Sequence, residues 1–293
     1  MVRFDLTLPG EIRFGAGRVS EVPGALADLG AKRVMVITGR TTSRADGIRA
    51  ALNAADMSSM VFGVATEPSI ERVRAAVDLA LETGCDAVLG FGGGSALDVA
   101  KAVAVLARSG TDPMDHLEVI GAGRPIERPG LPCVAVPTTA GTGSEVTRNS
   151  VLSGGGVKAS LRSPLLLPKL AVVDPDLLVG VPKPAIAASG MDALSQLIAV
   201  WRQYDPSHEG IFVPDLLERL YRREYTPSDD ASVAMRAALE NIVGCPPGRP
   251  PTPRQVGKRL GGFRRRVVGG AYLDTNPNEY RRGGAVWRLY SAQ

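Results

Sequence analysis

The most constraining feature of the sequence is a regular alternation of short apolar runs with helical patterns, from residue 10 to about residue 203. This alternation predicts a parallel β-sheet joined by crossover helices. The run Asp86–Gly92 is almost continuously apolar, as expected of a strand buried on both faces. The expected strand and helix pairs are Arg33–Gly39 with Arg44–Ala55, Ser59–Val64 with Ile70–Thr83, and Asp86–Gly92 with Leu97–Ala107. The predicted fold class is α/β, with a doubly wound sheet.

Two further strands and one long helix are predicted beyond this series. Cys133–Val136 and Leu170–Val173 read as strands, and Pro184–Arg202 reads as a helix. After Trp201 proline and arginine become dense, and Gly244–Pro253 is typical of a linker. We therefore expect an α/β domain over residues 1–182, a helical segment over 183–245 and a basic tail over 246–293.

Two loops at predicted strand ends have the composition of a ligand site. Gly92, Gly93, Gly94 and Ser95 join a strand to a helix, so the bare backbone and the helix N-terminus could receive a phosphate. The alternative is a tight turn without a ligand. Thr138–Glu145 gathers hydroxyls and glycines at another strand end. Ligands of open parallel sheets bind at the carboxyl ends of strands, so the two loops together predict one nucleotide-sized site.

Four motifs in this order resemble the iron-containing (group III) alcohol dehydrogenases. They are GGGSALDVAK (Gly92–Lys101), PTTAGTGSEVT (Pro137–Thr147), VVDPDLL (Val172–Leu178) and ASGMDALSQLI (Ala188–Ile198). The resemblance covers roughly residues 1–201 and implies the fold shared with dehydroquinate synthase. It implies hydride transfer between an alcohol or aldehyde and a nicotinamide cofactor, NAD or NADP.

The resemblance also implies which residues bind the dinucleotide. The residues implied for the pyrophosphate are Gly92, Gly93, Gly94, Ser95 and Asp98. Thr138, Thr139, Thr142 and Ser144 would line the adenosine and ribose side, and Lys158 is the candidate lysine for the ribose. The family often has an Asp directly after the strand that corresponds to Val34–Thr38. Here the chain has Gly39 and then Arg40. This change either favours a 2′-phosphate, and hence NADP, or places a solvated arginine at a helix start.

The metal site departs from the family pattern. The resemblance implies a divalent ion, Fe²⁺ or Zn²⁺, bound by an Asp and a His four residues apart and by two further His. Asp192 matches the Asp, but position 196 is Gln196, a weaker ligand for these ions than imidazole. The chain has two histidines, His116 and His208, and neither stands where a downstream ligand belongs. We therefore expect an incomplete metal site and an impaired enzyme whose catalytic half is truncated or replaced.

The C-terminal segment is strongly basic. Residues 246–293 contain ten arginines and lysines against Asp274 and Glu279, a net charge of +8, whereas the whole chain carries +4. Helices are expected at Val213–Glu224, Ala231–Val243 and Gln255–Phe263, then a ribbon of Arg264–Leu273 and Ala285–Tyr290 with a turn at Asn276–Asn278, a winged-helix-like order. Residues from about 210 to 293 also resemble C-terminal segments of phage and plasmid primase or helicase proteins.

This second resemblance implies nucleic-acid binding. Phosphate would be contacted by Arg254, Lys258, Arg259 and Arg264–Arg266. A solvated basic face is the alternative. For the whole chain, a second class of function is therefore a non-catalytic chimera of a dinucleotide-binding domain with a nucleic-acid-binding module, and a third interpretation is a join of two unrelated reading frames.

Composition narrows the setting. The chain is 44% apolar and 22% charged, which is ordinary for a globular protein. Three dispersed cysteines and the absence of a long apolar run predict a cytoplasmic protein that does not insert into a membrane. Without the family's helical half, Leu194, Leu197 and Ile198 are expected to be exposed, which predicts a homo-oligomer or aggregation through that helix.

Overall fold

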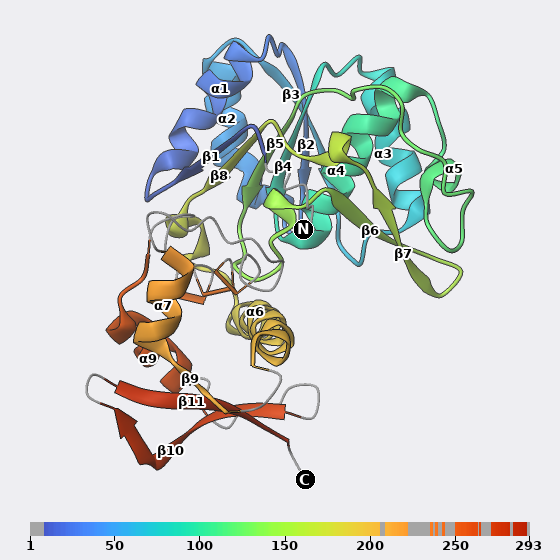
Figure 1. Cartoon of the computed structure of the whole chain (residues 1–293). Helices are drawn as coiled ribbons and strands as arrows, with labels where there is room; N and C mark the ends of the chain where they lie inside the picture. The colour runs from blue at the N-terminus through green and yellow to red at the C-terminus, as the bar shows by residue number, and fades with distance from the viewer. Residues whose placement is uncertain are drawn as a thin grey trace. The chain divides into compact units, whose positions relative to one another are not determined.

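A computed structural model describes residues 9–205, 209–221, 235–236, 238–239, 242–243, 250–262, 264, 271–281 and 284–291. These residues form two compact units that meet in sequence at Val181 and Pro182 (Figure 1). The first unit is an α/β structure. The second contains residues from both of the predicted C-terminal segments, 183–245 and 246–293.

The α/β unit is built on a six-stranded sheet in which every neighbouring pair is parallel. In sheet order the strands are β1 (Glu11–Phe14), β8 (Leu170–Val173), β5 (Cys133–Pro137), β4 (Ala87–Gly92), β2 (Arg33–Thr38) and β3 (Ser58–Gly63). The strands predicted from apolar runs are all present, each within two residues of its expected ends. The α/β class is confirmed.

Helices cover both faces of this sheet (Figure 1). On strand β2, Val34 and Val36 pack in a core with helices α1 and α2, whereas Met35 and Ile37 pack in a core with α3 and α4. This alternation is the period of two of a β-strand, and it makes the sheet doubly wound, as predicted. The helices are α1 (Val22–Asp28), α2 (Asp46–Ala54), α3 (Ile70–Glu82), α4 (Gly94–Ser109) and the short α5 (Pro113–His116).

A β-hairpin that the sequence analysis did not predict lies beside α4. It consists of β6 (Asn149–Gly154) and β7 (Val157–Arg162), joined by Gly155 and Gly156. Both glycines have positive φ, as a two-residue turn of type I′ requires. The Gly-Gly pair between two alternating runs is therefore a signal from which this hairpin could have been predicted. Five short 3-10 segments complete the unit, at Arg18–Glu21, Thr42–Ala45, Ser144–Val146, Pro164–Leu166 and Pro175–Leu178.

The C-terminal unit has its own core of helices packed on a three-stranded antiparallel sheet. Its sheet order is β10 (Ala271–Arg281), β11 (Gly284–Ser291) and β9 (Ile211–Phe212). Its helices include α6 (Lys183–Tyr204), α7 (Val213–Tyr221) and α9 (Pro253–Gly262), and the described residues from 235 to 243 are also helical. The expected order of a helix followed by a two-stranded ribbon is present.

Two predictions for this unit are wrong. Leu194, Leu197 and Ile198 are not exposed: they are at most 3% exposed, because they pack in a core that also contains Trp287 and Leu289 of the ribbon. The reason given for oligomerisation therefore fails, and a homo-oligomer stays a prediction without it.

The expected turn at Asn276–Asn278 lies inside strand β10 instead. The ladder to β11 shifts register between Thr275 and Tyr280, an irregularity that accommodates Pro277, which has no N–H to donate to a ladder. The first ribbon strand also begins later than expected, at Ala271 rather than Arg264.

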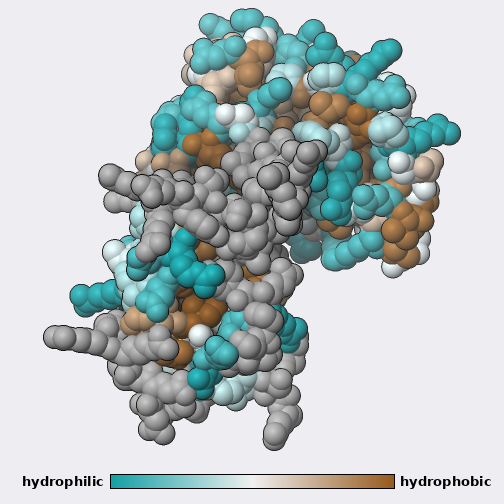
Figure 2. Space-filling model, in the orientation of Figure 1, coloured by the Kyte–Doolittle hydropathy of each residue, from teal (hydrophilic) through white to brown (hydrophobic). Residues whose placement is uncertain are grey.

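The visible surface of the described residues mixes hydrophilic and hydrophobic side chains in small groups (Figure 2). Among those residues, no helix is both long enough and apolar enough to cross a bilayer.

Candidate functional site

The sheet topology has a switch point between β2 and β4. From β2 the chain first adds β3 at the edge of the sheet and then returns to place β4 on the other side of β2. The helix after β2, α2, packs on one face, and the helix after β4, α4, packs on the other. Connections that diverge in this way leave a gap above the strand ends, which is where open parallel sheets bind ligands.

Three predicted loops pack against one another at this edge. A Cβ added to Gly92 would lie 3.3 Å from the backbone nitrogen of Gly39, the residue that follows β2. The Thr138 N–H, from the loop after β5, donates to the Gly92 carbonyl at 2.9 Å. The structure therefore brings Gly39, the glycine loop and the threonine loop together, as the sequence analysis expected.

The glycines and threonines of these loops fit closely. A Cβ on Gly93 would lie 3.1 Å from Thr139 Oγ1, and one on Gly94 would lie 2.8 Å from Thr142 Cγ2. A side chain at position 94 would therefore push the threonine loop away. The glycines serve two purposes: they admit the neighbouring loop and leave the backbone bare toward the edge of the sheet.

The N-terminus of α4 opens at the same edge. The Ala96 N–H donates to the carbonyl of the N-cap, Gly93, whereas the N–H groups of Gly94 and Ser95 precede the first helical hydrogen bond and no side chain caps them. Ser95 lies in the first turn and is half-buried. Free N–H groups and the helix dipole together favour an anion, so this end of α4 suits a phosphate.

A buried ion pair holds the threonine loop from behind. Lys101 Nζ lies 3.0 Å from Asp98 Oδ1, and the Lys101 side chain is fully buried. Its ammonium also donates to the carbonyls of Ser144, at 2.9 Å, and Asn149, at 2.5 Å. This role of Lys101 was not predicted, although a lysine within an apolar helix pattern is a signal of a buried charged group that needs a partner.

The structure gives Asp98 and Ser144 supporting positions. Ser144 Oγ donates to Asp98 Oδ1 at 2.5 Å, and the Val151 N–H donates to Asp98 Oδ2 at 3.1 Å. Protein donors therefore engage both carboxylate oxygens. These bonds tie Asp98 to residues 144–151; its contact with the pyrophosphate stays a prediction.

One acidic residue of this loop is electrostatically perturbed. Burial raises the pKa of the Glu145 carboxyl above its ordinary value, because desolvation disfavours the charged form; the nearby ammonium of Lys101 opposes the shift. The protonated form is therefore favoured here relative to a solvated glutamate.

The remaining predicted cofactor residue is Lys158, whose contact with the ribose stays a prediction. Lys158 is on β7 and donates to Glu67 Oε1 at 2.7 Å, with both side chains 62% exposed.

Another residue of the recognised motifs has a structural role. The Asp174 carboxylate accepts from the N–H groups of Gly17 and Val19 and so ties the segment after β1 to the end of β8.

The predicted metal ligands fall largely outside the described side chains. Asp192 and Gln196 lie on α6 of the C-terminal unit, and their side chains lie outside the described part. His116 is buried in the α/β unit with both ring nitrogens engaged, Nε2 by Thr111 Oγ1 and Nδ1 by the Arg124 carbonyl, each at 2.8 Å. His208 is not among the described residues. Within the described ranges, no three His, Cys, Asp or Glu side chains gather.

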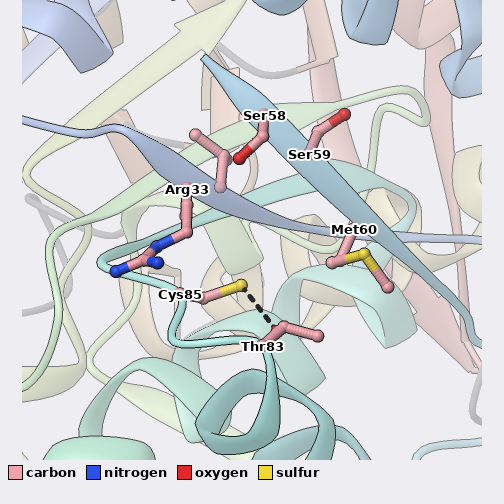
Figure 3. A pocket seen from close by; sticks show the side chains of 7 residues that line it. Arg33, Ser58, Ser59, Met60, Thr83 and Cys85 are labelled. Atoms are coloured by element: carbon pink, nitrogen blue, oxygen red, sulfur yellow. Dashed lines mark hydrogen bonds between the residues drawn. The ribbon is translucent and has the colours of Figure 1, made fainter.

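A small hollow lies at the opposite edge of the sheet (Figure 3). Arg33 and Val34 line it from the start of β2, Ser58 to Met60 from the start of β3, and Thr83 and Cys85 from the segment after α3. These are the amino ends of the strands, where open parallel sheets do not place their ligands. We therefore do not assign the site to this hollow.

Comparison with known proteins identifies the family. The model of the iron-containing alcohol dehydrogenases matches residues 9–175. The chain belongs to this family. It is 36% identical over 233 residues to a long-chain-alcohol dehydrogenase of Geobacillus thermodenitrificans, covering 77% of the chain and 59% of that relative. It is 34% identical over 200 residues to the NAD-dependent methanol dehydrogenase of Bacillus methanolicus, covering 66% of the chain and 51% of that relative.

Solved structures agree with this assignment. A sulfoacetaldehyde reductase from Bifidobacterium kashiwanohense, solved with NAD⁺, matches 81% of the chain and 65% of its own length, with a TM-score of 0.64 and 30% identity. A 1,3-propanediol oxidoreductase matches 81% of the chain and 64% of its own length, with a TM-score of 0.64 and 28% identity. The family member thus spans between half and two thirds of the length of these relatives. The resemblance of residues 210–293 to primase or helicase proteins stays a prediction.

Proposed function

We propose that this alcohol dehydrogenase family member binds NAD(H) or NADP(H) at the carboxyl edge of its sheet, between β2 and β4. The supporting observation is the packing of three loops, after β2, β4 and β5, around one helix N-terminus. A relative is named as NAD-dependent, and a matching structure was solved with NAD⁺. The reaction proposed is hydride transfer between a small alcohol or aldehyde and the nicotinamide.

The loop residues have distinct parts in this proposal. Gly92, Gly93 and Gly94 would let the pyrophosphate approach the backbone, and the first N–H groups of α4 would donate to it. Thr138, Thr139 and Thr142 would line the adenosine and ribose side. When bound, the nicotinamide supplies the hydride acceptor or donor. The chain's own contribution is to orient the dinucleotide, and Lys101 and Asp98 hold the threonine loop in place for it.

We further propose that the site accepts NADP(H) as well as NAD(H). Position 39 is a glycine without a carboxylate to repel a 2′-phosphate, and the exposed Arg40 follows it. Arg40 Nε donates to the Ala65 carbonyl at 3.1 Å, which places its guanidinium beside the loop after β3.

Whether the chain binds a metal ion distinguishes a working dehydrogenase from a protein that only binds the dinucleotide. Gln196 stands where the family resemblance implies a histidine, and both ring nitrogens of His116 are used inside the α/β unit. We therefore propose that the chain binds the dinucleotide but turns over alcohols slowly. A dinucleotide-binding protein without dehydrogenase activity is the second candidate, and the shortage of histidines favours it.

Titration of the full chain with NADH and with NADPH, followed by fluorescence, tests the proposal. Both dinucleotides should bind, and Arg40→Asp should weaken NADPH at least tenfold while leaving NADH within about twofold. Arg44→Asp, which also changes an exposed arginine of this segment, is the matched control and should shift neither affinity selectively. If neither NADH nor NADPH bound, the proposed function would be overturned.

Metal analysis and an aldehyde reduction assay on the same sample separate the two candidates. Bound metal with measurable NAD(P)H oxidation supports a working dehydrogenase. Dinucleotide binding without either supports the second candidate.

A further inference from the structure

We propose that the C-terminal unit binds double-stranded DNA through the exposed basic face of helix α9. The unit has the order of a helical DNA-binding module: α6, α7, further helical residues and α9 precede an antiparallel ribbon, β10–β11. Strand β9 adds to the ribbon edge, so that β11 is central. The arrangement differs in kind from the parallel sheet of the α/β unit, and the proposed dinucleotide site does not use it.

Helix α9 begins at a well-formed N-terminal cap. Thr252 Oγ1 accepts from the Gln255 N–H at 3.3 Å, and Gln255 Oε1 accepts from the Thr252 N–H at 2.8 Å. This reciprocal pair is a capping box, and Pro253 occupies the first turn, where its missing N–H costs nothing. The helix start is therefore fixed by local chemistry.

Only one face of α9 packs on the unit. Val256 and Leu260, four residues apart, are fully buried in the core of this unit. Arg254 and Lys258 are also four residues apart and exposed, and Arg259 is exposed beside them. No described residue forms an ion pair with any of these three cations. The outward face of the helix therefore presents uncompensated positive charge.

Two glycines of α9 leave its backbone uncovered by side chains. An added Cβ at Gly257 or Gly261 would meet no atom within 4 Å, so packing does not explain these residues. In the interior of the helix, Gly257 costs about 1 kcal/mol of helix stability relative to alanine. A bare backbone between cationic side chains lets a helix approach a charged surface closely, which gives these glycines a physical reason.

The acidic residues of this segment do little to offset the charge. Asp274 is buried and forms an ion pair with Arg264. Residues 246–293 carry a net charge of +8, while the rest of the chain is acidic overall. A localised positive face of this kind attracts phosphate backbones.

The residue types on the exposed face of α9 indicate which kind of anionic partner it binds. Beyond Pro253 in its first turn this face has only arginine, lysine, glutamine and glycine, so it lacks both the cluster of hydrophobic anchors of a protein interface and the insertion face of a membrane-bound helix. A single α-helix fits the major groove of B-DNA, which is about 12 Å wide. Arginine and lysine contacts to phosphate give affinity without sequence specificity, so we expect binding to be nonspecific.

Fluorescence anisotropy of the full chain with a labelled duplex of random sequence tests this inference. Three phosphate contacts predict a log–log salt slope of about −2.7, or a loss of about 40-fold in affinity between 50 and 200 mM NaCl. The variant Arg254→Gln/Lys258→Gln/Arg259→Gln should lose most of this affinity and flatten the slope by about that amount.

A matched control removes the same charge from the other unit. Lys32→Gln/Arg108→Gln/Arg128→Gln changes three exposed cations of the α/β unit and should leave DNA affinity within about threefold. Circular dichroism and tryptophan fluorescence should show that both variants remain folded. Failure of the wild type to bind DNA, equal losses in the two variants, or tighter binding to polyglutamate or to anionic lipid vesicles than to the duplex would overturn the proposal.

Discussion

Removing the buried ammonium of Lys101 is the sharpest perturbation of the candidate site. Lys101→Met keeps an unbranched side chain that is one atom shorter and deletes the charge. Asp98, whose side chain is 15% exposed, then loses its ion-pair partner, and the carbonyls of Ser144 and Asn149 lose a donor. The loop that lines the proposed ribose side is released from α4.

The expected cost follows from breaking a buried pair on one side. Removing one partner of such a pair costs about 3–5 kcal/mol, because an uncompensated charge stays buried. The orphaned carbonyls belong to the same network, so their cost is not simply added. For a unit of this size, about 2–4 °C per kcal/mol gives a fall in Tm of about 6–20 °C.

Two optical probes separate the unfolding of the two units. Both tryptophans, Trp201 and Trp287, are buried in the C-terminal unit, so tryptophan fluorescence follows that unit alone. Far-ultraviolet circular dichroism follows both. Lys101→Met should lower the transition that lacks a fluorescence change and weaken NADH binding.

The double variant Lys101→Met/Asp98→Asn supplies the internal control. It removes the stranded charge. The single amide oxygen can still accept from the Val151 N–H, and the Ser144 hydroxyl can rotate to accept from the amide NH₂, so part of the lost stability should return. A single-variant loss below about 1 kcal/mol, or a double variant no more stable than Lys101→Met, would refute the reasoning.

Other predictions follow from packing and charge. Leu197→Ala should destabilise the C-terminal unit by about 2–5 kcal/mol, seen as earlier loss of the tryptophan signal; an unchanged transition would show that α6 is not part of that core. Gly94→Ala should weaken NADH binding because its Cβ would lie 2.8 Å from Thr142 Cγ2; unaltered affinity would contradict the loop packing. Because the pKa of Glu145 is raised on folding, the folded state holds its proton more firmly than the unfolded state, and stability should fall as pH rises from the unfolded pKa through the folded one. Glu145→Gln should flatten the dependence of Tm on pH over that range, and an equal slope in both proteins would contradict the shift.

Local patterns predicted the α/β unit well. The strands β2, β4 and β5 are short and apolar, and each is followed by a glycine or threonine loop. The apolar run and the loop residues therefore place the end of each strand at the same point. The meeting of Gly39, Gly92 and Thr138 followed from one rule, that parallel strands end at the same edge. The roles of Lys101 and Asp98 could not be predicted in this way, because most of their partners are backbone groups or side chains 43 to 53 residues away in the sequence.

Local patterns predicted the packing of the C-terminal unit poorly. The exposure expected for Leu197 rested on the loss of a partner domain, whereas the chain supplies a different partner, the ribbon with Trp287 and Leu289. The turn expected at Pro277 failed because a register shift lets a strand pass a residue without an N–H. Both errors concern long-range packing, which local propensity does not encode.

Hydrogen exchange of the full chain with and without saturating NADH tests the central claim most directly. We predict that binding protects amides in three separate segments together, residues 39–42, 92–97 and 138–147, and leaves the hollow around Arg33, Ser58 and Cys85 unchanged. Protection confined to one segment, or protection at the hollow instead, would contradict a dinucleotide site between β2 and β4.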